Sequence, residues 1–288
     1  MRLAVSSYSF MRHLKETHET CRDLCTRARD MGFEGIEFTG GTLAMEETAP
    51  QRLAEELRAH CNRIGLAIVA YTVGADFLKD PQLEIQRLKG CVDIAARLGA
   101  PVMRHDATWI REGSWQEAIA RMAPSIRQVA AYAAEKNVRT CTENHGYFIQ
   151  DSCRMEALMQ AVNHPNYGWL VDIGNFACAD ENSLSAVRTA APYAVHVHAK
   201  DFLWRSKAEG DPADEAHGLG EGWFPTREGH FLRGTIPGRG VIPLEACLQL
   251  LHRSGYDGWV AYEFEGPEPV LEALPEGYAY LRRLINPC

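Results

Sequence analysis

The chain has 288 residues, of which 46% are hydrophobic and 24% are charged, and its formal net charge is −8. This balance is typical of a folded protein with a large core, and the acidic charge disfavours a surface built to bind nucleic acid. No stretch approaches the ~20 apolar residues that a membrane helix needs, and the N-terminal MRLAVSSYSF does not resemble a secretory signal. We therefore expect a cytoplasmic protein with no nucleic-acid or membrane partner.

The nine cysteines are scattered along the chain, no two of them form a CxxC pair, and most lie in apolar segments. This pattern favours buried free thiols in a reducing compartment over a disulfide framework. Cys21 and Cys25 are spaced for one helix face, where small core residues are a better interpretation than metal ligands.

Short apolar segments rich in β-branched residues alternate with longer amphipathic segments from one end of the chain to the other. Each short segment has the length and composition of a strand, and each amphipathic one the spacing of a helix. In chain order, the eight predicted strands are Leu3–Tyr8, Phe33–Phe38, Leu66–Thr72, Val102–Asp106, Val138–Glu143, Trp169–Asp172, Ala194–Lys200 and Trp259–Glu263.

Several of the intervening helices have recognisable starts. Ser114 followed by Glu117 predicts a capping box, Asp80-Pro81 places proline in a first helical turn, and Pro243 opens another helix. In the first predicted helix, apolar residues recur at helical spacing and form one face. They are Cys21, Leu24, Ala28 and Met31.

Two joints between helix and strand are alike, namely Gly32-Phe33-Glu34-Gly35 and Gly255-Tyr256-Asp257-Gly258. In each, the first glycine suits a left-handed helix cap and the aromatic residue packs at the strand entrance. Eight repeated strand–helix units predict a closed parallel (β/α)8 TIM barrel, forming a single domain over residues 1–288. An open doubly wound sheet competes, but SSYSF is not the glycine-rich turn typical of that fold. Residues 202–241 lack periodicity and are predicted to form a long functional loop after strand seven.

The working groups of such barrels lie at the carboxyl ends of the strands. Reading those ends gives Glu143, Asp172, His198 and Glu263 from four consecutive predicted strands. Each alone has an ordinary structural interpretation, such as a helix cap or a core histidine. Together they form a cluster of carboxylates that would repel one another unless a cation neutralised them. The sequence therefore predicts one divalent metal ion, Mn²⁺, Mg²⁺, Co²⁺ or Zn²⁺, bound by these four residues.

The chain resembles the xylose isomerase-like barrels, and within them the sugar phosphate isomerase/epimerase family. The resemblance covers nearly the whole chain and lies in motifs at and beyond the strand ends. These motifs are Glu143-Asn144-His145, Asp172-Ile173-Gly174-Asn175, His198-Ala199-Lys200-Asp201, Pro237-Gly238-Arg239-Gly240 and Gly255-Tyr256-Asp257-Gly258 leading to Glu263.

The resemblance implies that the four strand-end residues bind one divalent metal and that Glu143 and Glu263 also exchange substrate protons. Many ketose 3-epimerases and the barrel endonucleases that cut abasic DNA have histidine where this chain has Asn175. Some ketopentose-phosphate 3-epimerases are similar to this chain in having asparagine there. Asn175 therefore argues against a nuclease, and we expect it to contact the substrate.

The resemblance implies a metal-dependent isomerase or epimerase of a sugar or sugar phosphate, acting through a metal-stabilised enediolate. Loss of a β-hydroxyl from the same enediolate would instead make the enzyme a dehydratase of a keto-cyclitol or related keto sugar. A barrel endonuclease and a non-catalytic carbohydrate-binding protein are further alternatives. The resemblance also favours a homo-oligomer, such as a dimer or a tetramer.

Strand parity places further polar residues near the mouth of the barrel. Each of them has a structural alternative, such as an ion pair for Glu37 and Arg104, or neutralisation of the carboxylates for Lys200. The residues expected to bind the substrate are Tyr8, Glu37, Arg104, His145, Asn175 and Lys200.

Overall fold

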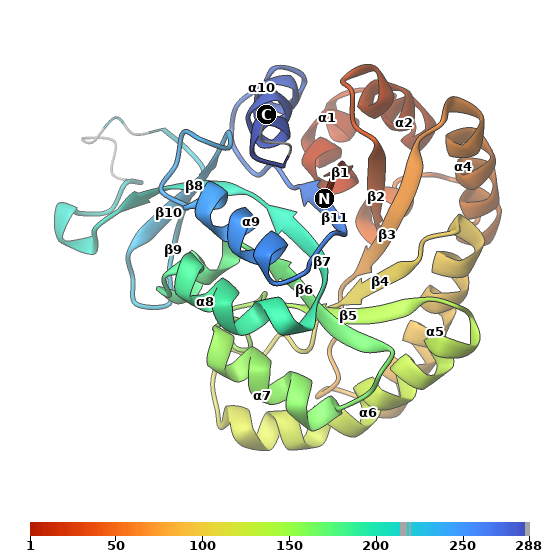
Figure 1. Cartoon of the computed structure of the whole chain (residues 1–288), viewed down its shortest axis with the longest axis horizontal. Helices are drawn as coiled ribbons and strands as arrows, with labels where there is room; N and C mark the ends of the chain where they lie inside the picture. The colour runs from red at the N-terminus through yellow and green to blue at the C-terminus, as the bar shows by residue number, and fades with distance from the viewer. Residues whose placement is uncertain (214–217, 219, 286–288) are drawn as a thin grey trace.

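A computed structural model describes residues 1–213, 218 and 220–285, and it is a closed barrel of eight parallel strands surrounded by helices (Figure 1). Around the barrel the strands follow the order β1-β11-β7-β6-β5-β4-β3-β2. Their bounds are β1 Arg2–Ser6, β2 Gly35–Thr39, β3 Ala67–Val73, β4 Val102–His105, β5 Arg139–Glu143, β6 Tyr167–Asp172, β7 Ala194–Ala199 and β11 Trp259–Tyr262. All eight predicted strands are confirmed, with ends that shift by a few residues.

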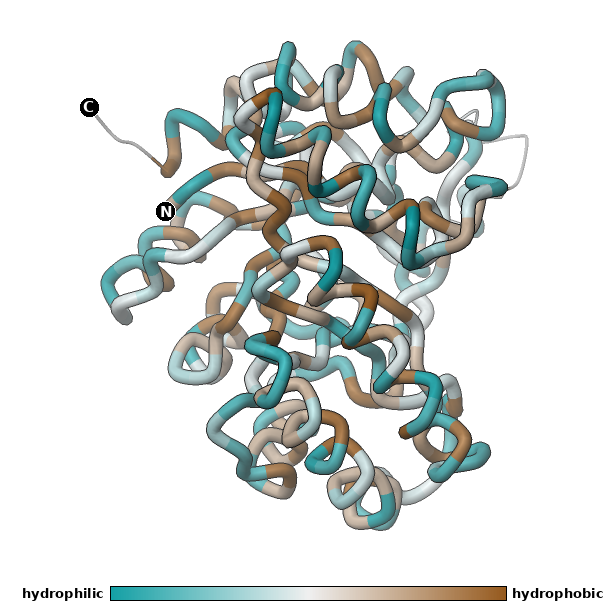
Figure 2. The backbone as a smooth tube through the Cα atoms, turned by 90° about the vertical axis from the view of Figure 1, so that its right-hand side faces the viewer, coloured by the Kyte–Doolittle hydropathy of each residue, from teal (hydrophilic) through white to brown (hydrophobic). Residues whose placement is uncertain are grey.

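The helices cover the outside of this barrel (Figure 1). The α-helices are α1 Met11–Glu16, α2 Cys21–Asp30, α3 Gly40–Leu43, α4 Pro50–Ile64, α5 Pro81–Leu98, α6 Trp115–Glu135, α7 Ser152–Val162, α8 Ser183–Ala190, α9 Leu244–Arg253 and α10 Val270–Ile285. Short 3-10 turns are η1 Ser7–Phe10, η2 Asn175–Ala179, η3 Ala191–Tyr193 and η4 Lys207–Glu209. Hydrophobic and hydrophilic segments alternate along the helices (Figure 2), as expected for helices that bury one face against the strands. No helix among the described residues has both the length and the apolar character to cross a membrane.

Two of the three predicted helix starts are confirmed, and the third is confirmed in part. Asp80 accepts a bond from the Leu83 amide with Pro81 in the first turn of α5, and Pro243 immediately precedes α9. Ser114 caps α6 by accepting from the Glu117 amide, but no return bond from the Glu117 side chain completes the predicted capping box.

The two glycine joints behave alike. Gly32 has φ +97° and Gly255 has φ +91°, a left-handed conformation that favours glycine. The following aromatic residues, Phe33 and Tyr256, are both buried, and the Tyr256 hydroxyl donates to the Trp259 carbonyl at 2.6 Å. The predicted caps at these joints are confirmed.

Four buried side chains, Ala4, Val69, Ala70 and Ala261, form a small cluster separate from the main core, with Trp259 packed against it. The Arg2 guanidinium lies 4.1 Å from the centre of the Trp259 ring. The larger core lies between the strands and the helices and includes Trp169, Phe33 and Phe38.

The segment after β7 differs from the predicted irregular loop. Three strands, β8 Asp201–Arg205, β9 Trp223–Pro225 and β10 Phe231–Thr235, form an antiparallel sheet of order β8-β10-β9 beside the barrel (Figure 1). The prediction was wrong because the many glycine, proline and charged residues in this stretch mask three short strands. Residues 214–217 and 219 of the predicted loop lie outside the described residues.

Seven of the eight described cysteines are buried, all eight are free, and Cys153 is exposed. This agrees with the expected buried thiols, while Cys288 lies outside the described residues. Cys21 and Cys25 pack in the core, with Leu24 and Ala28 on the same helix face.

Candidate metal and substrate site

The carboxyl ends of four strands bring three carboxylates and one imidazole together. Glu143 ends β5, Asp172 ends β6, His198 lies in β7 and Glu263 directly follows β11. One ligand atom from each residue lies within 4.8 Å of the others, and all four residues are buried. His198 Nδ1 is 3.6 Å from Asp172 Oδ2, 3.6 Å from Glu263 Oε2 and 3.9 Å from Glu143 Oε1. The four residues predicted as one cluster thus lie together.

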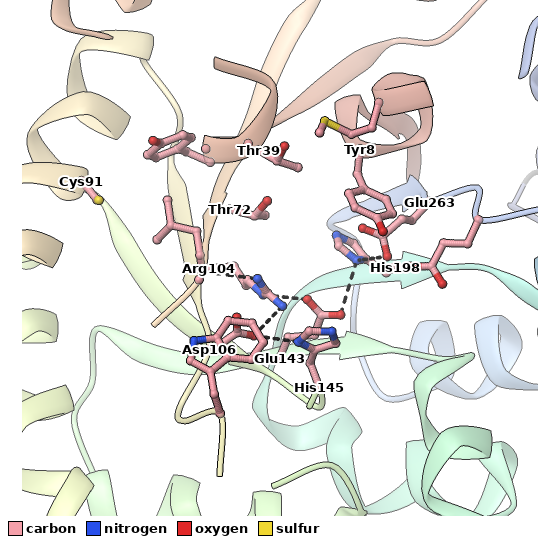
Figure 3. Close-up of a pocket in the computed structure, with 18 of the residues that line it drawn as sticks. Tyr8, Thr39, Thr72, Cys91, Arg104, Asp106, Glu143, His145, His198 and Glu263 are labelled. Atoms are coloured by element: carbon pink, nitrogen blue, oxygen red, sulfur yellow. Dashed lines mark hydrogen bonds and ion pairs between the residues drawn. The ribbon is translucent and has the colours of Figure 1, made fainter. Parts of the chain in front are cut away.

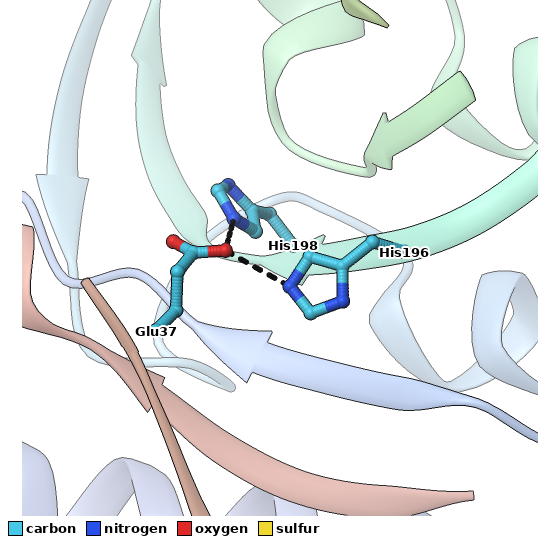
Figure 4. Close-up of side chains that lie close together, drawn as sticks. All are labelled: Glu37, His196 and His198. Atoms are coloured by element: carbon cyan, nitrogen blue, oxygen red, sulfur yellow. Dashed lines mark hydrogen bonds and ion pairs between the residues drawn. The ribbon is translucent and has the colours of Figure 1, made fainter. Parts of the chain in front are cut away.

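Glu37 fixes the orientation of the His198 ring (Figure 4). His196 and His198 are two residues apart in β7 and therefore face the same side of the strand. Glu37 Oε2 lies 2.9 Å from Nε2 of each ring. The ionised carboxylate is acceptor-only, so His198 donates its Nε2 proton to Glu37 and turns the lone pair of Nδ1 toward the carboxylates.

This position of Glu37 differs from the one expected for a substrate ligand. Its side chain is completely buried and is absent from the residues that line the pocket. Burial opposes its ionisation, but His198 and His196 outweigh that effect and lower the pKa of Glu37. Of the two interpretations that the sequence left open, the structure favours the ion pair.

Lys200 lies among the carboxylates of the cluster. Its Nζ is 3.0 Å from Asp172 Oδ2, 2.5 Å from Glu263 Oε2 and 3.1 Å from Glu265 Oε1. The side chain passes Gly174, where an added Cβ would lie 2.5 Å from Lys200 Cγ. The glycine of the Asp-Ile-Gly-Asn motif therefore makes room for the lysine. Lys200 lines the pocket and neutralises the carboxylates at the same time.

Arg104 connects Glu143 to a second carboxylate (Figure 3). Its Nε lies 2.6 Å from Glu143 Oε2 and its Nη2 lies 2.7 Å from Asp106 Oδ1. His145 Nδ1 lies 3.0 Å from the same Asp106 oxygen. Arg104 and His145 line the pocket, as expected for substrate ligands, and Asp106 positions both.

Asn175 lies behind Glu143 rather than on the pocket wall. It is 3% exposed, is not among the pocket-lining residues, and its Nδ2 donates to Glu143 Oε1 at 2.8 Å. The amides of Gly174 and Asn175 both donate to Asp172 Oδ1 at 2.9 Å. The expected substrate contact of Asn175 is therefore replaced by a hydrogen bond that orients Glu143.

The charges in the cluster act unequally on its two glutamates. Burial raises the pKa of Glu143 to about 7, although Arg104 and His198 oppose this rise. Burial acts on Glu263 as well, but Lys200 and His198 outweigh it and hold its pKa well below the ordinary value. A divalent cation between them would favour the ionised form of both.

The donor set fits a divalent cation. One buried atom that faces the cluster, His198 Nδ1, makes no hydrogen bond within the described part of the chain and lies 3.6–3.9 Å from the three carboxylates. Buried polar atoms are seldom left in that state without an ion or a water. Three carboxylates and one imidazole suit Zn²⁺, Mn²⁺, Co²⁺ or Mg²⁺, and no thiolate lies among them.

A pocket of about 530 Å³ opens over the cluster (Figure 3). Glu143, His198 and Glu263 form part of its wall. Tyr8, which was expected to bind the substrate, lies in η1 rather than in the first strand and stands at the pocket rim, 44% exposed. The Glu265 carboxylate and burial raise the pKa of Tyr8 to about 12, so its phenol stays protonated at neutral pH.

Hydrogen bonds of the Asp201 carboxylate connect two of the sequence motifs. Its Oδ1 accepts from the amides of Phe202 and Ile242 at 2.9 and 3.1 Å, and its Oδ2 accepts from those of Gly238 and Gly240 at 2.8 and 2.9 Å. A Cβ on Gly240 would lie 2.2 Å from Asp201 Oδ1. The Lys-Asp motif thus holds the Pro-Gly-Arg-Gly turn against the end of β7.

Three residues at the site were not predicted. Asp106 ends the fourth predicted strand, Glu265 shares the strand parity of Glu263, and Trp109 belongs to no motif. Asp106 has the strand-end signal that identified the four cluster residues, so that signal was available. Trp109 lies in a loop and had none.

The chain is similar over part of its length to several curated enzymes. An inosose dehydratase from Yersinia enterocolitica is 29% identical over 181 residues, which are 61% of this chain and 55% of that enzyme. The chain spans about half the length of the curated relatives it matches.

Several solved structures share the fold at low sequence identity. The probable 3-DHS dehydratase AsbF from Bacillus anthracis has a TM-score of 0.74 at 18% identity, covering 100% of both chains. The IolI protein with a bound zinc atom has a TM-score of 0.75 at 18% identity, covering 99% of this chain and 98% of the other. D-psicose 3-epimerase from Clostridium cellulolyticum H10, solved with D-tagatose, has a TM-score of 0.75 at 15% identity, covering 99% and 100%.

The sequence also matches the profile of the xylose isomerase-like TIM barrels over residues 25–284. This span contains the four residues of the cluster and every strand of the barrel except β1. Sequence profile and barrel topology therefore agree: the chain belongs to the xylose isomerase-like TIM barrel family.

Proposed function

We propose that this protein is a divalent-metal-dependent dehydratase that removes water from a keto-cyclitol or a closely related keto sugar. The observation that carries the proposal is the cluster of Glu143, Asp172, His198 and Glu263 beneath a pocket lined by further proton-transfer groups. The curated relatives, which are named inosose dehydratases, support dehydration over the isomerase or epimerase chemistry that the motifs first suggested. The four cluster residues would hold the metal.

A metal ion bound there would act as a Lewis acid toward the substrate carbonyl. The chain itself supplies the proton transfers. A carboxylate, Glu143 or Glu263, takes the hydrogen from the carbon next to the carbonyl, and the electron pair forms a carbon–carbon double bond. The bond from the next carbon to its hydroxyl then breaks, and the hydroxyl leaves as water after accepting a proton. The product is a conjugated carbonyl compound.

We assign donation of that proton to His145. Its Nδ1 is hydrogen-bonded to Asp106, while its Nε2 has no hydrogen bond within the described residues. The side chain lines the pocket, as Glu143 does. Asp106 is itself held by Arg104, so the imidazole has a fixed orientation. Lys200 keeps Glu263 ionised and in place through their contact at 2.5 Å.

The test is product analysis with an inosose, a ketose and an aldose, each incubated with metal-loaded enzyme in D₂O. We expect the inosose to lose water, with a new ultraviolet absorbance from the conjugated product and a matching NMR spectrum. Interconversion of ketoses or of aldose and ketose, with no water loss from the inosose, would replace the dehydratase by the isomerase or epimerase alternative.

The variant His145→Asn separates removal of the α-hydrogen from loss of water. His145→Asn should slow water loss by about 10²–10⁴-fold while the carboxylates still exchange the α-hydrogen for deuterium. His252→Asn, which changes an exposed histidine in α9 outside the pocket, is the matched control and should behave like the wild type. Equal loss of exchange and dehydration in His145→Asn would contradict its assignment as the proton donor.

A further inference from the structure

The pocket extends well beyond the carboxylate cluster. Figure 3 shows Thr39 and Thr72 between the cluster residues His198 and Glu263 on one side and Cys91 of α5 on the other. Tyr71 and Gly74 belong to the same wall. The cavity is therefore elongated, and it runs from the cluster across the ends of β2 and β3 toward α5.

This cavity is larger than a single ring requires. At the ~30 Å³ that a water molecule occupies in the liquid, 530 Å³ has room for about eighteen waters, whereas a keto-cyclitol has about twelve non-hydrogen atoms. Covalently bonded atoms occupy less space than separate waters do. A ring bound at the cluster thus fills less than two thirds of the pocket and leaves the part toward α5 open.

The open part carries groups suited to a sugar. The hydroxyls of Tyr71 and Thr72 line it and make no hydrogen bond among the described residues. Trp109 is 52% exposed, and its indole packs over Gly74, where an added Cβ would lie 3.0 Å from Trp109 Cζ2. Two hydroxyls and one exposed aromatic face are a suitable combination for a polar ring that has one apolar side.

The lysine and arginines that line the pocket are already neutralised. Arg104 pairs with Glu143 and Asp106, and Lys200 with three carboxylates of the cluster region. Arg87, which lines the far part of the pocket, holds Glu84 at 2.8 Å and also donates to the Gly74 carbonyl. A phosphate or carboxylate in this part would meet no free lysine or arginine, so an uncharged group is favoured.

We propose that the region formed by Tyr71, Thr72, Gly74 and Trp109 is a second subsite, and that the physiological substrate is a keto ring bearing an uncharged glycosyl group that binds there. This inference rests on the proposed dehydratase function for the ring end of the substrate. It names a substrate class, glycosylated keto-polyols, that a single-ring site would not favour.

The test uses polyols that lack the keto group and therefore bind without turnover. Isothermal titration of metal-loaded protein compares myo-inositol, its galactoside galactinol and myo-inositol 1-phosphate. We expect galactinol to bind roughly tenfold more tightly than myo-inositol, since its second ring covers apolar surface on Trp109, and the phosphate to bind no better than myo-inositol. Thr72→Val should remove most of the advantage of galactinol and leave myo-inositol binding unchanged. Trp109→Ala should weaken galactinol binding more than myo-inositol binding, since the Trp109 ring also packs 5.9 Å from the ring of His145.

Trp204→Ala is the matched control, because Trp204 is 47% exposed in β8 and lies outside the pocket. It should leave both affinities unchanged. Equal affinity for galactinol and myo-inositol, no binding of either, or tighter binding of the phosphate than of galactinol would each overturn the subsite. Turnover of free inosose, measured separately, would leave the proposed dehydratase function standing in all three cases.

Discussion

Glu37→Gln tests whether the buried carboxylate prepares His198 for metal binding. Glu37 Oε2 accepts both histidine Nε2 protons at 2.9 Å, whereas its Oε1 has no hydrogen bond in the described part of the chain. The amide group of glutamine fits this arrangement, with its oxygen toward the histidines and its NH₂ in the place of Oε1. The substitution therefore removes the charge and keeps both hydrogen bonds.

The size of the effect follows from those bonds. Hydrogen bonds to a charged group contribute about 1.5–3 kcal/mol and neutral ones about 1 kcal/mol, so the His198 ring loses about 0.5–2 kcal/mol of support. Because 1.4 kcal/mol is a factor of ten, metal affinity should fall by roughly 2–30-fold, which overlaps the range usual for partners of metal-binding histidines.

The assay is competition for Zn²⁺ or Mn²⁺ between the protein and a chelator of known affinity. Glu34→Gln is the matched control, since Glu34 is 40% exposed, lies three residues away and pairs with Arg282 at 2.7 Å. It should bind metal like the wild type. If Glu37→Gln retains metal affinity within twofold of the wild type, the orienting role of Glu37 is refuted.

Three further predictions follow from the site and its supports. Glu143→Gln and Glu263→Gln should each retain part of the metal, measured by elemental analysis, and lower turnover by about 10²–10⁴-fold; near wild-type rates in metal-loaded variants would contradict their role in proton transfer. Asp201→Asn turns an NH₂ group toward two backbone amides that now donate to a carboxylate oxygen, so urea unfolding should show a loss of roughly 2–5 kcal/mol, and an unchanged midpoint would count against that contact network. Burial lowers the pKa of His105 to about 4 from an unfolded value near 6.5, so the unfolded chain binds the extra proton first and this contribution to stability declines as pH falls from about 6.5 to about 4. His105→Gln should flatten that part of the wild-type pH dependence, and an identical slope in both proteins would show that His105 does not cause it.

The barrel and the cluster were predictable because both depend on local patterns. Strand segments recur with helix segments between them, and the carboxyl ends of parallel barrel strands meet at one end. Glu143, Asp172, His198 and Glu263 each stand at such an end, so their convergence follows from the order of elements.

The roles of the surrounding residues depend on depth and register, which the sequence does not encode locally. A register shift between Ile36 and Glu37 in the pairing of β2 with β3 accompanies the burial of Glu37 against the β7 histidines. Strand parity predicts which face of β2 carries the Glu37 side chain, but not that this side chain is buried behind the residues that line the pocket. Asn175 begins a 3-10 turn instead of extending into the pocket, and this turn places its amide on Glu143.

The small antiparallel sheet after β7 was missed for a different reason. Its strands are only three to five residues long and bury few large apolar side chains, chiefly Phe202 and Leu232, which is too few to give the clear alternation of longer strands. Leu203 and Trp204 of β8 are both partly or fully exposed, while Asp201 at its start is buried by the turn it holds. Contacts distant in sequence, such as those of Asp201 with Gly238 and Gly240, define this region.

The most direct test of the proposed chemistry is the metal dependence of dehydration in a single absorbance experiment. Wild-type protein is stripped with a chelator, mixed with an inosose and then supplied with Mn²⁺, Co²⁺, Zn²⁺ or Mg²⁺ in turn. We predict no absorbance change before metal is added, and a steady rise from the conjugated product after at least one of the ions is supplied, with water loss verified by mass spectrometry. A rise of equal rate in the stripped protein, or consumption of inosose without water loss, would contradict a metal-dependent dehydratase.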